Sequence, residues 1–214
     1  MCTEILSSLE NIVWGPFYVE NAPFRAKISP VYSVGIPLIV KGRVFGLDTR
    51  RPIRFASIDI WHASPEAQYD YHEVDPSVKY PYKEEVNKHG RSSHFDYRSR
   101  LVTDEQGQYE YETVKPVPYF DGEDSTWRCP HIHYYVQASG YKPLITQLYF
   151  KGEEKNDIGM KNTSLLRRSS SFCLVDHHID ESTTIELESI ECQRSDGSKL
   201  NYLQGEFDVI MATN

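Results

Sequence analysis

The sequence has too little positive charge and too few cysteines for several common protein classes. Its 23 Lys and Arg residues are outnumbered by 31 Asp and Glu residues, which gives a formal net charge of −8. Nucleic-acid binding needs a basic face, so this balance argues against a nucleic-acid partner. The four cysteines form no Cys-x-x-Cys pair, which removes support for a zinc knuckle or a thioredoxin-like motif. We expect them to be reduced packing residues.

Long hydrophobic runs and targeting signals are also missing. Nowhere do eighteen apolar residues follow one another, and residues 1–5 lack the basic start and apolar run of a secretory signal. These absences predict a cytoplasmic protein without a membrane partner. There is no Gly-rich phosphate-binding loop and no Gly-x-Ser-x-Gly motif. With 39% hydrophobic and 25% charged residues, residues 1–214 are expected to form a single globular domain.

What the chain does contain is a series of short β-type segments separated by turn residues. Residues 1–36 contain prolines and little periodicity, which predicts an extended lead-in and no N-terminal helical domain. The turn at 104–107 predicts a hairpin of 101–103 with 108–114. Many short strands with turn signals predict an all-β fold, an antiparallel β-sandwich or barrel-like core with long loops. The predicted strands are 38–45, 55–61, 101–103, 108–114, 132–136, 144–150, 183–190 and 206–211.

The central motif of the chain is His131-Ile132-His133. Side chains alternate along a strand, so the two imidazoles share a face and can bind one metal ion. Two buried histidines satisfied by hydrogen bonds would give the same pattern, so the motif alone leaves both interpretations open. Tyr119 closes a Pro-Val-Pro-Tyr run, and Tyr69 follows the strand that ends at Trp61. Two phenolates with two neutral imidazoles suit Fe(III), because a hard, highly charged ion favours anionic oxygen donors.

Together these segments resemble the intradiol ring-cleavage dioxygenases, the ferric enzymes that include protocatechuate 3,4-dioxygenase, catechol 1,2-dioxygenase and hydroxyquinol 1,2-dioxygenase. The resemblance extends from about Trp14 to Phe150, roughly two thirds of the chain. It is carried by Gly15–Tyr18, Lys41–Val44, Ile58–Ala63, Thr103–Tyr109, Thr113–Tyr119, Arg128, His131–His133 and Thr146–Phe150.

The resemblance implies an Fe(III) cofactor and a set of site residues. The implied metal ligands are Tyr69, Tyr119, His131 and His133, with Tyr119 as the axial ligand that also accepts a substrate proton. Two further implied site residues are Arg128, which stabilises the ketonised substrate anion, and Gln147, which borders the substrate. The implied reaction uses O2 to cleave a catechol-type ring between its two hydroxyls and gives a cis,cis-muconate-type diacid. Family habit suggests a homo-oligomer.

The sequence departs from the family pattern at three places. Ala67-Gln68-Tyr69 replaces the usual Gly-x-Tyr, and Tyr71 would share a face with Tyr69 in an extended segment, so the first tyrosine ligand stays open between the two. The usual Arg-Pro-x-His becomes Arg128-Cys129-Pro130-His131. The polar segment 70–98 is long and its role is open.

Two other functions are compatible with part of the pattern. One is a non-catalytic β-sandwich that binds a small molecule without iron. The other is a non-intradiol oxygenase, such as a cupin with Fe(II) at His131 and His133, although the glutamate that cupins place soon afterwards is missing from 134–149. A further pair, His177 and His178, lies in a polar stretch and is interpreted as a surface turn. His62 is interpreted as a supporting or packing residue, and which catechol is the substrate stays open.

Overall fold

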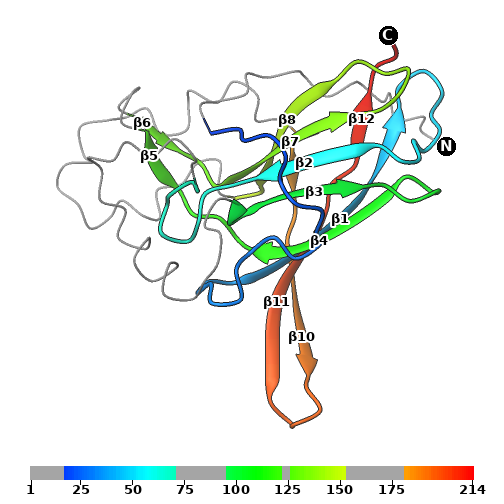
Figure 1. Ribbon diagram of the computed structural model, residues 1–214. Coiled ribbons are helices and arrows are strands. Elements are labelled where there is room, and N and C mark those ends of the chain that lie inside the picture. The colour runs from blue at the N-terminus through cyan, green and yellow to red at the C-terminus, as the bar shows by residue number, and fades with distance from the viewer. Residues whose placement is uncertain (1–16, 71–94, 122–125, 153–180) are drawn as a thin grey trace.

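The computed structural model describes residues 17–70, 95–121, 126–152 and 181–214, which contain twelve strands and no α-helix. Two five-stranded sheets pack face to face, and a short two-stranded ribbon lies at one side (Figure 1). The predicted all-β sandwich is therefore confirmed. Both sheets also contain parallel pairs, which the sequence did not indicate.

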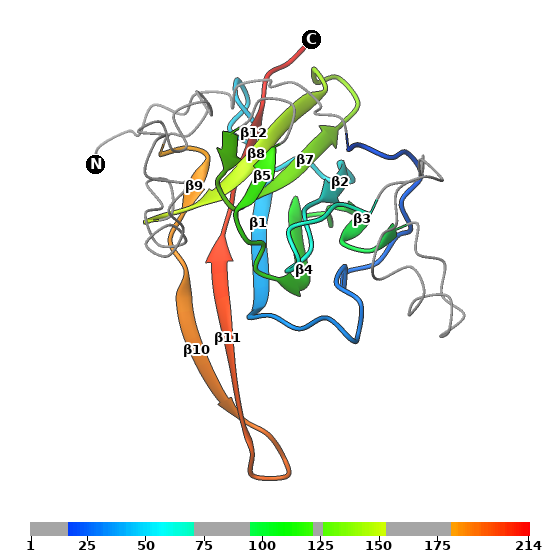
Figure 2. The ribbon, with the colours of Figure 1, turned by 90° about the vertical axis from the view of Figure 1, so that its left-hand side faces the viewer.

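The first sheet is built around one long central strand. Its strands are β1 (Pro37–Gly46), β4 (Gln108–Val114), β10 (Glu188–Gln193), β11 (Lys199–Glu206) and β12 (Val209–Met211). β1 pairs antiparallel with β4 and parallel with β11 and β12. β10 and β11 continue as a ribbon that projects from the body of the molecule (Figure 2).

The second sheet carries the residues of interest. Its order is β3-β2-β7-β8-β9, with β2 (Ser57–Trp61), β3 (Arg98–Val102), β7 (His131–Gln137), β8 (Leu144–Phe150) and β9 (Thr184–Ile185). Alternation decides its two faces: Ile58, Ile60 and Ile132 point into the core between the sheets, while Trp61, His131 and His133 point outward. Each fully buried aliphatic side chain of this core contributes about 1.5–3 kcal/mol.

Three tyrosines are buried in the same core. Tyr109, Tyr111 and Tyr134 are each at most 5% exposed. The hydroxyls of Tyr111 and Tyr134 hydrogen-bond at 2.6 Å, and Tyr109 donates to the carbonyl of Phe207 at 2.6 Å. Burial raises the pKa of all three phenols, so they stay neutral and their hydroxyls are satisfied within the core.

The hairpin predicted from 101–103 and 108–114 is wrong. β3 pairs with β2 in the second sheet, whereas β4 pairs with β1 in the first. The turn between them crosses from one sheet to the other, and the Asp104 carboxylate caps it by accepting from the amides of Gln106 and Gln108. Gly107, at φ 72°, supplies the left-handed residue that the turn requires. A local turn motif does not reveal which strand each arm will pair with.

The predicted strands at 183–190 and 206–211 are each divided in the structure. The first becomes β9 and the start of β10, and the second becomes the end of β11 and β12. The expectation of reduced cysteines is also wrong at Cys129, which is disulfide-bonded. Cys192 is free and exposed. No described helix is long and apolar enough to cross a membrane.

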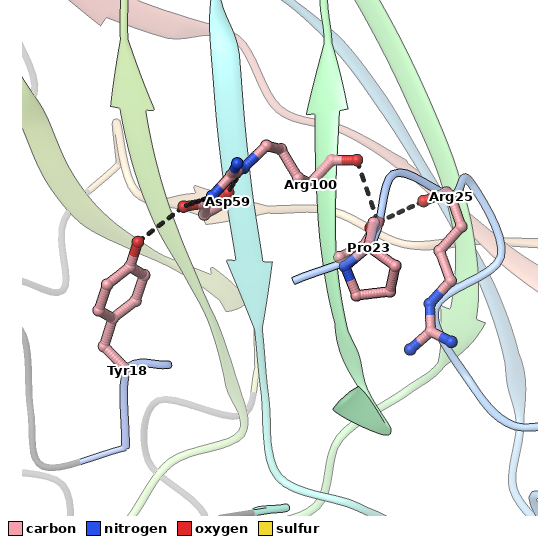
Figure 3. Close-up of polar contacts among 6 residues, drawn as sticks. Tyr18, Pro23, Arg25, Asp59 and Arg100 are labelled. Atoms are coloured by element: carbon pink, nitrogen blue, oxygen red, sulfur yellow. Dashed lines mark hydrogen bonds and ion pairs between the residues drawn. The ribbon is translucent and has the colours of Figure 1, made fainter. Parts of the chain in front are cut away.

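The lead-in chain contacts the second sheet at Tyr18 and then runs beside the edge strand β3. Tyr18 donates to the buried Asp59 carboxylate at 2.7 Å, and Arg100 forms an ion pair with the same carboxylate at 2.6 Å (Figure 3). The Arg100 amide donates to the Pro23 carbonyl at 3.0 Å. Side-chain and main-chain bonds thus fix the lead-in beside the face that carries His131 and His133.

Candidate metal centre

The side chains that the sequence singled out converge on the outer face of the second sheet. His131 and His133 begin β7, and Gln147 lies directly opposite His133 on β8. Tyr69 follows the turn that comes after β2. The remaining two, Tyr119 and Arg128, face each other as a cross-strand pair of β5 (Tyr119–Asp121) and β6 (Thr126–Arg128).

Three donor atoms meet at the centre of this group. The phenol oxygen of Tyr69 lies 3.2 Å from Nε2 of His131 and 3.2 Å from Nε2 of His133, and the two Nε2 atoms are 3.1 Å apart. Metal ions such as zinc hold nitrogen and oxygen ligands about 2.0–2.2 Å away, which leaves neighbouring ligand atoms about 3 Å from each other. The three atoms therefore have the spacing of ligands to a single ion.

Both histidines present Nε2 to this point. Nδ1 of His131 donates to the carbonyl of Cys129 at 2.7 Å, which leaves Nε2 unprotonated in the neutral ring. The His133 ring is oriented by Trp61, whose indole stacks on it at 4.7 Å with an interplanar angle of 2°. Burial, followed by the charges of His131, Arg128 and Arg98, holds the pKa of His133 well below its usual value. Its neutral imidazole is the form that binds a metal.

The two tyrosines lie against each other and against the histidines. Their rings meet edge to face at 5.5 Å, and the Tyr119 ring is 5.7 Å from that of His131. Burial raises the pKa of Tyr69 well above its usual value, and the neighbouring Tyr119 adds to the increase. A phenol in this place keeps its proton unless a cation replaces it, because a bound metal lowers ligand pKa values steeply. The donor set therefore fits a metal ion.

The turn before Tyr69 holds an unusual residue. Its hydrogen bonds run from Ser64 to Gln68 and from Ala67 back to Ser64. Ala67 has φ 61°, in the left-handed region that favours glycine. The Gly-x-Tyr pattern of the intradiol enzymes places glycine at this position, so the departure noted in the sequence falls on a strained residue.

Four other residues named from the sequence are not among the donors described above. Tyr71, His177 and His178 lie outside the described residues, as does most of the segment 70–98. His62 is buried and both of its ring nitrogens have other partners, with Nδ1 2.7 Å from the Ala63 carbonyl and Nε2 2.7 Å from the Thr113 hydroxyl. Burial lowers the pKa of His62 to about 4. Its satisfied ring packs the region behind the site.

Three neighbours of the site carried no signal of their own in the sequence. Phe17 stacks on the Tyr69 ring at 4.3 Å and 11°. Tyr149 donates to Oε1 of Gln147 at 2.5 Å, which leaves the amide N–H groups of Gln147 to point elsewhere. Arg98 donates to the main-chain carbonyl of Asp70, the residue that follows Tyr69. The described residues contain no group of three or more His, Cys, Asp and Glu side chains that could hold a metal ion, because half of this donor set is tyrosine.

Comparison with known proteins decides the family. A family model described as Dioxygenase matches residues 13–162, well over half of the chain. The chain belongs to the intradiol dioxygenase family. Enzymes of this family use Fe(III), and the cluster of Tyr69, His131 and His133 resembles their iron site.

Sequence relatives of this intradiol dioxygenase homologue include a chlorocatechol 1,2-dioxygenase from Pseudomonas putida, 33% identical over 154 residues, which are 65% of this chain and 53% of the relative. A catechol 1,2-dioxygenase from Acinetobacter baylyi is 30% identical over 155 residues, 65% of this chain and 45% of that protein. The chain thus spans about half the length of the curated relatives it matches.

Solved structures share the fold. Hydroxyquinol 1,2-dioxygenase from Pseudomonas putida DLL-E4 superposes with a TM-score of 0.70 at 21% identity, covering 97% of this chain and 67% of that one. The dioxygenase domain of a carbohydrate-binding fusion protein from Streptomyces sp. SirexAA-E gives a TM-score of 0.66 at 22% identity, covering 97% and 100%. At these identities the likeness extends to the fold alone.

Proposed function

We propose that this chain is a ferric intradiol dioxygenase. It cleaves the ring of a catechol-type substrate between the two hydroxyls with O2 and yields a cis,cis-muconate-type diacid. The observation that carries this proposal is the meeting of three donor atoms, the Tyr69 phenol and the Nε2 atoms of His131 and His133, within 3.2 Å of one another and against Tyr119. Membership of the family supports the reaction class.

The residues that would hold the iron are Tyr69, Tyr119, His131 and His133. Ferric iron, when bound, acts as a Lewis acid that draws electron density from a bound catechol. Tyr119 has a second role, because its phenolate oxygen can accept a proton from a substrate hydroxyl.

Arg128 supplies positive charge at the site. Its charge adds to the low pKa of His133 and partly opposes the larger effect of burial, which raises the pKa of Tyr69, so its field reaches the donor atoms. A guanidinium in this place stabilises the anionic ring as negative charge develops, a role worth about 2.7–4 kcal/mol for a donor in comparable oxyanion sites.

Gln147 borders the substrate from β8. Its carbonyl oxygen accepts from Tyr149, so its two amide N–H groups are the free donors that can face a substrate oxygen. It is buried and lies directly opposite His133. This arrangement orients the substrate without adding charge.

A cupin-like oxygenase with Fe(II) is less well supported than a ferric enzyme. The third donor atom beside the two histidines is a phenol oxygen, and anionic phenolate suits ferric iron better than ferrous iron. A non-catalytic binding module would need no metal at all, and the colour of the protein separates it from the enzyme.

The test is iron reconstitution followed by oxygen uptake on a panel of catechols. Ferric protein with tyrosinate ligands is expected to be red-brown, and mass analysis should find both atoms of O2 in a product opened between the hydroxyls. Colourless protein without iron after reconstitution would contradict the enzyme, and cleavage outside the hydroxyls would contradict the intradiol assignment.

A further inference from the structure

We propose that Arg98 is a positioning residue for Tyr69, holding the phenol where the two histidine nitrogens can share an ion with it. The proposal rests on the proposed function for its consequence, since it concerns a ligand of the same site. The contacts by which one buried guanidinium fixes the Tyr69 ring are all made by described residues.

Arg98 is buried at the start of β3, with only 2% of its surface exposed. An arginine is almost never buried so completely unless its donors are used. Its Nε donates to the carbonyl of Asp70 at 2.8 Å, and a second N–H of the same guanidinium reaches the same oxygen. Another N–H donates to the carbonyl of Phe17 at 2.5 Å.

These two carbonyls belong to the chain segments that hold the Tyr69 ring. Asp70 directly follows Tyr69, so its carbonyl fixes the main chain on that side of the ligand. Phe17 covers one face of the Tyr69 ring, stacked at 4.3 Å and 11°. One planar guanidinium therefore ties together the backbone that carries the phenol and the backbone that carries its covering ring.

Tyr69 needs such an anchor more than the histidines do. His131 and His133 lie on a strand that is hydrogen-bonded to neighbours, so the sheet ladder sets their positions. Tyr69 lies outside any strand, directly after a turn and two residues after Ala67 at φ 61°. A ligand of this kind is held in place by the residues behind it, and an error of about 1 Å is enough to weaken a designed site.

The strand register of the second sheet gives Arg98 and Arg100 different neighbours. Arg98 is opposite Trp61, and Trp61 is opposite His133, so Arg98 begins the cross-strand row that crosses the site. Arg100 begins the next row, opposite Asp59, and its ion pair with Asp59 serves the lead-in through Tyr18. The two arginines lie on one strand and one face, but Arg98 binds main-chain carbonyls and Arg100 binds the Asp59 carboxylate.

The experiment compares Arg98→Lys with Arg100→Lys. Lysine keeps the charge but lacks the planar fork that reaches two carbonyls, so it tests the clamp rather than the charge. The first measurement uses metal-free protein with 13C-labelled tyrosine rings, the Tyr69 signal being assigned with Tyr69→Phe. Arg98→Lys should shift the Tyr69 ring signal, and Arg100→Lys should leave it in place.

The second measurement is iron affinity by chelator competition. Arg98→Lys should weaken iron binding by about 10–100-fold, the usual cost of losing a residue that supports a metal ligand. In a Tyr69→Phe background the same substitution should have much less effect, because the ligand that Arg98 positions is already gone. Arg100→Lys should retain wild-type affinity and lower only thermal stability.

An unshifted Tyr69 signal in folded Arg98→Lys would overturn the proposal, whether or not the protein binds iron. If Arg98→Lys does not fold, Arg98→Gln replaces it, because glutamine keeps a planar amide donor but cannot reach both carbonyls. An unshifted Tyr69 signal in that variant would overturn the proposal equally. Wild-type protein that takes up no iron would instead contradict the proposed function, so the two failures are distinguishable.

Discussion

Two groups of buried tyrosines differ in what their hydroxyls meet. In the core between the sheets, Tyr111 bonds to Tyr134 and Tyr109 bonds to a main-chain carbonyl. On the outer face of the second sheet, the Tyr69 hydroxyl meets two imidazole nitrogens at equal distance. Burial raises the pKa of the phenol in both places.

The comparison shows that burial and a raised pKa do not by themselves mark a functional tyrosine. The hydroxyls of the three core tyrosines, Tyr109, Tyr111 and Tyr134, all have hydrogen-bond partners within the core, so they are not available to a ligand. The site tyrosine shares its space with two Nε2 atoms, of which at most one donates a proton to it in the neutral state. The same distinction separates His62, which has both nitrogens satisfied, from His131 and His133. Substitutions in the two groups should therefore have different consequences.

The largest effect is expected from removing a histidine of the site. His133→Ala deletes one of the three converging donor atoms. Loss of a residue that only supports a ligand costs up to about 100-fold in metal affinity, and loss of the ligand itself should cost more. Iron content and oxygen uptake measure this. His62→Gln is the matched control and should keep its iron, whereas equal loss in both variants would erase the distinction between the two kinds of histidine.

Tyr69→Phe should change the colour of the iron-loaded protein. Removing one phenolate ligand should bleach or shift the tyrosinate-to-iron absorption and slow turnover by at least about 100-fold, the scale of losing one donor at a charged site. The visible spectrum is the measurement. If Tyr71→Phe changed the spectrum and Tyr69→Phe did not, the first tyrosine ligand would be Tyr71.

Tyr134→Phe should cost stability and leave the colour unchanged. It deprives the buried Tyr111 hydroxyl of its partner, which costs about 1–3 kcal/mol of unfolding free energy. Denaturant unfolding gives this value. Loss of the iron spectrum in a folded Tyr134→Phe protein would mean that the three core tyrosines are not independent of the site.

Acid should destabilise the metal-free protein through His62. Its pKa in the fold is about 4, below the unfolded value of 6.5, so between these pH values the unfolded chain binds a proton that the folded chain does not. Stability is then retained above pH 6.5 and lost as pH falls toward 4, with a slope of up to about 1.4 kcal/mol per pH unit. Unfolding from pH 7 to 5 should be less pH-dependent in His62→Gln, and an identical slope would contradict the assignment.

The smallest expected effect is a gain of stability at the turn before Tyr69. Ala67→Gly relieves a residue at φ 61° and should raise the unfolding free energy by at most about 1 kcal/mol. Thermal unfolding of the metal-free protein measures this. A decrease would show that the flexibility gained in the unfolded chain outweighs the strain removed.

Local patterns in the sequence predicted most of the strands, and the family resemblance supplied the residues of the candidate site, whose roles stay a prediction. The alternation around His131-Ile132-His133 correctly places both histidines on one face, because strand geometry alone dictates it. The sequence could not predict that β3 pairs with β2 and β4 pairs with β1. The turn at Asp104 is equally compatible with a hairpin and with a crossing between sheets. The disulfide of Cys129 was likewise missed, because residue spacing does not reveal which cysteines a fold brings together.

Arg98 illustrates the part of the site that no local pattern reveals. Its function depends on the carbonyls of Phe17 and Asp70, which the fold brings together from distant segments. A buried arginine bonded to main-chain oxygens leaves no motif, because any residue type can supply a carbonyl. Phe17 was noticed only within the Gly-Pro-Phe-Tyr segment of the resemblance, and its contact with Tyr69 required the structure.

The most direct test of the account is the visible spectrum of iron-reconstituted protein, recorded for the wild type, Tyr69→Phe and Tyr134→Phe together. A ferric site with Tyr69 as a ligand should give a tyrosinate-to-iron band in the wild type, the same band in Tyr134→Phe, and a lost or shifted band in Tyr69→Phe. Wild-type protein that binds iron without any such band, or a band that survives unchanged in Tyr69→Phe, would contradict it.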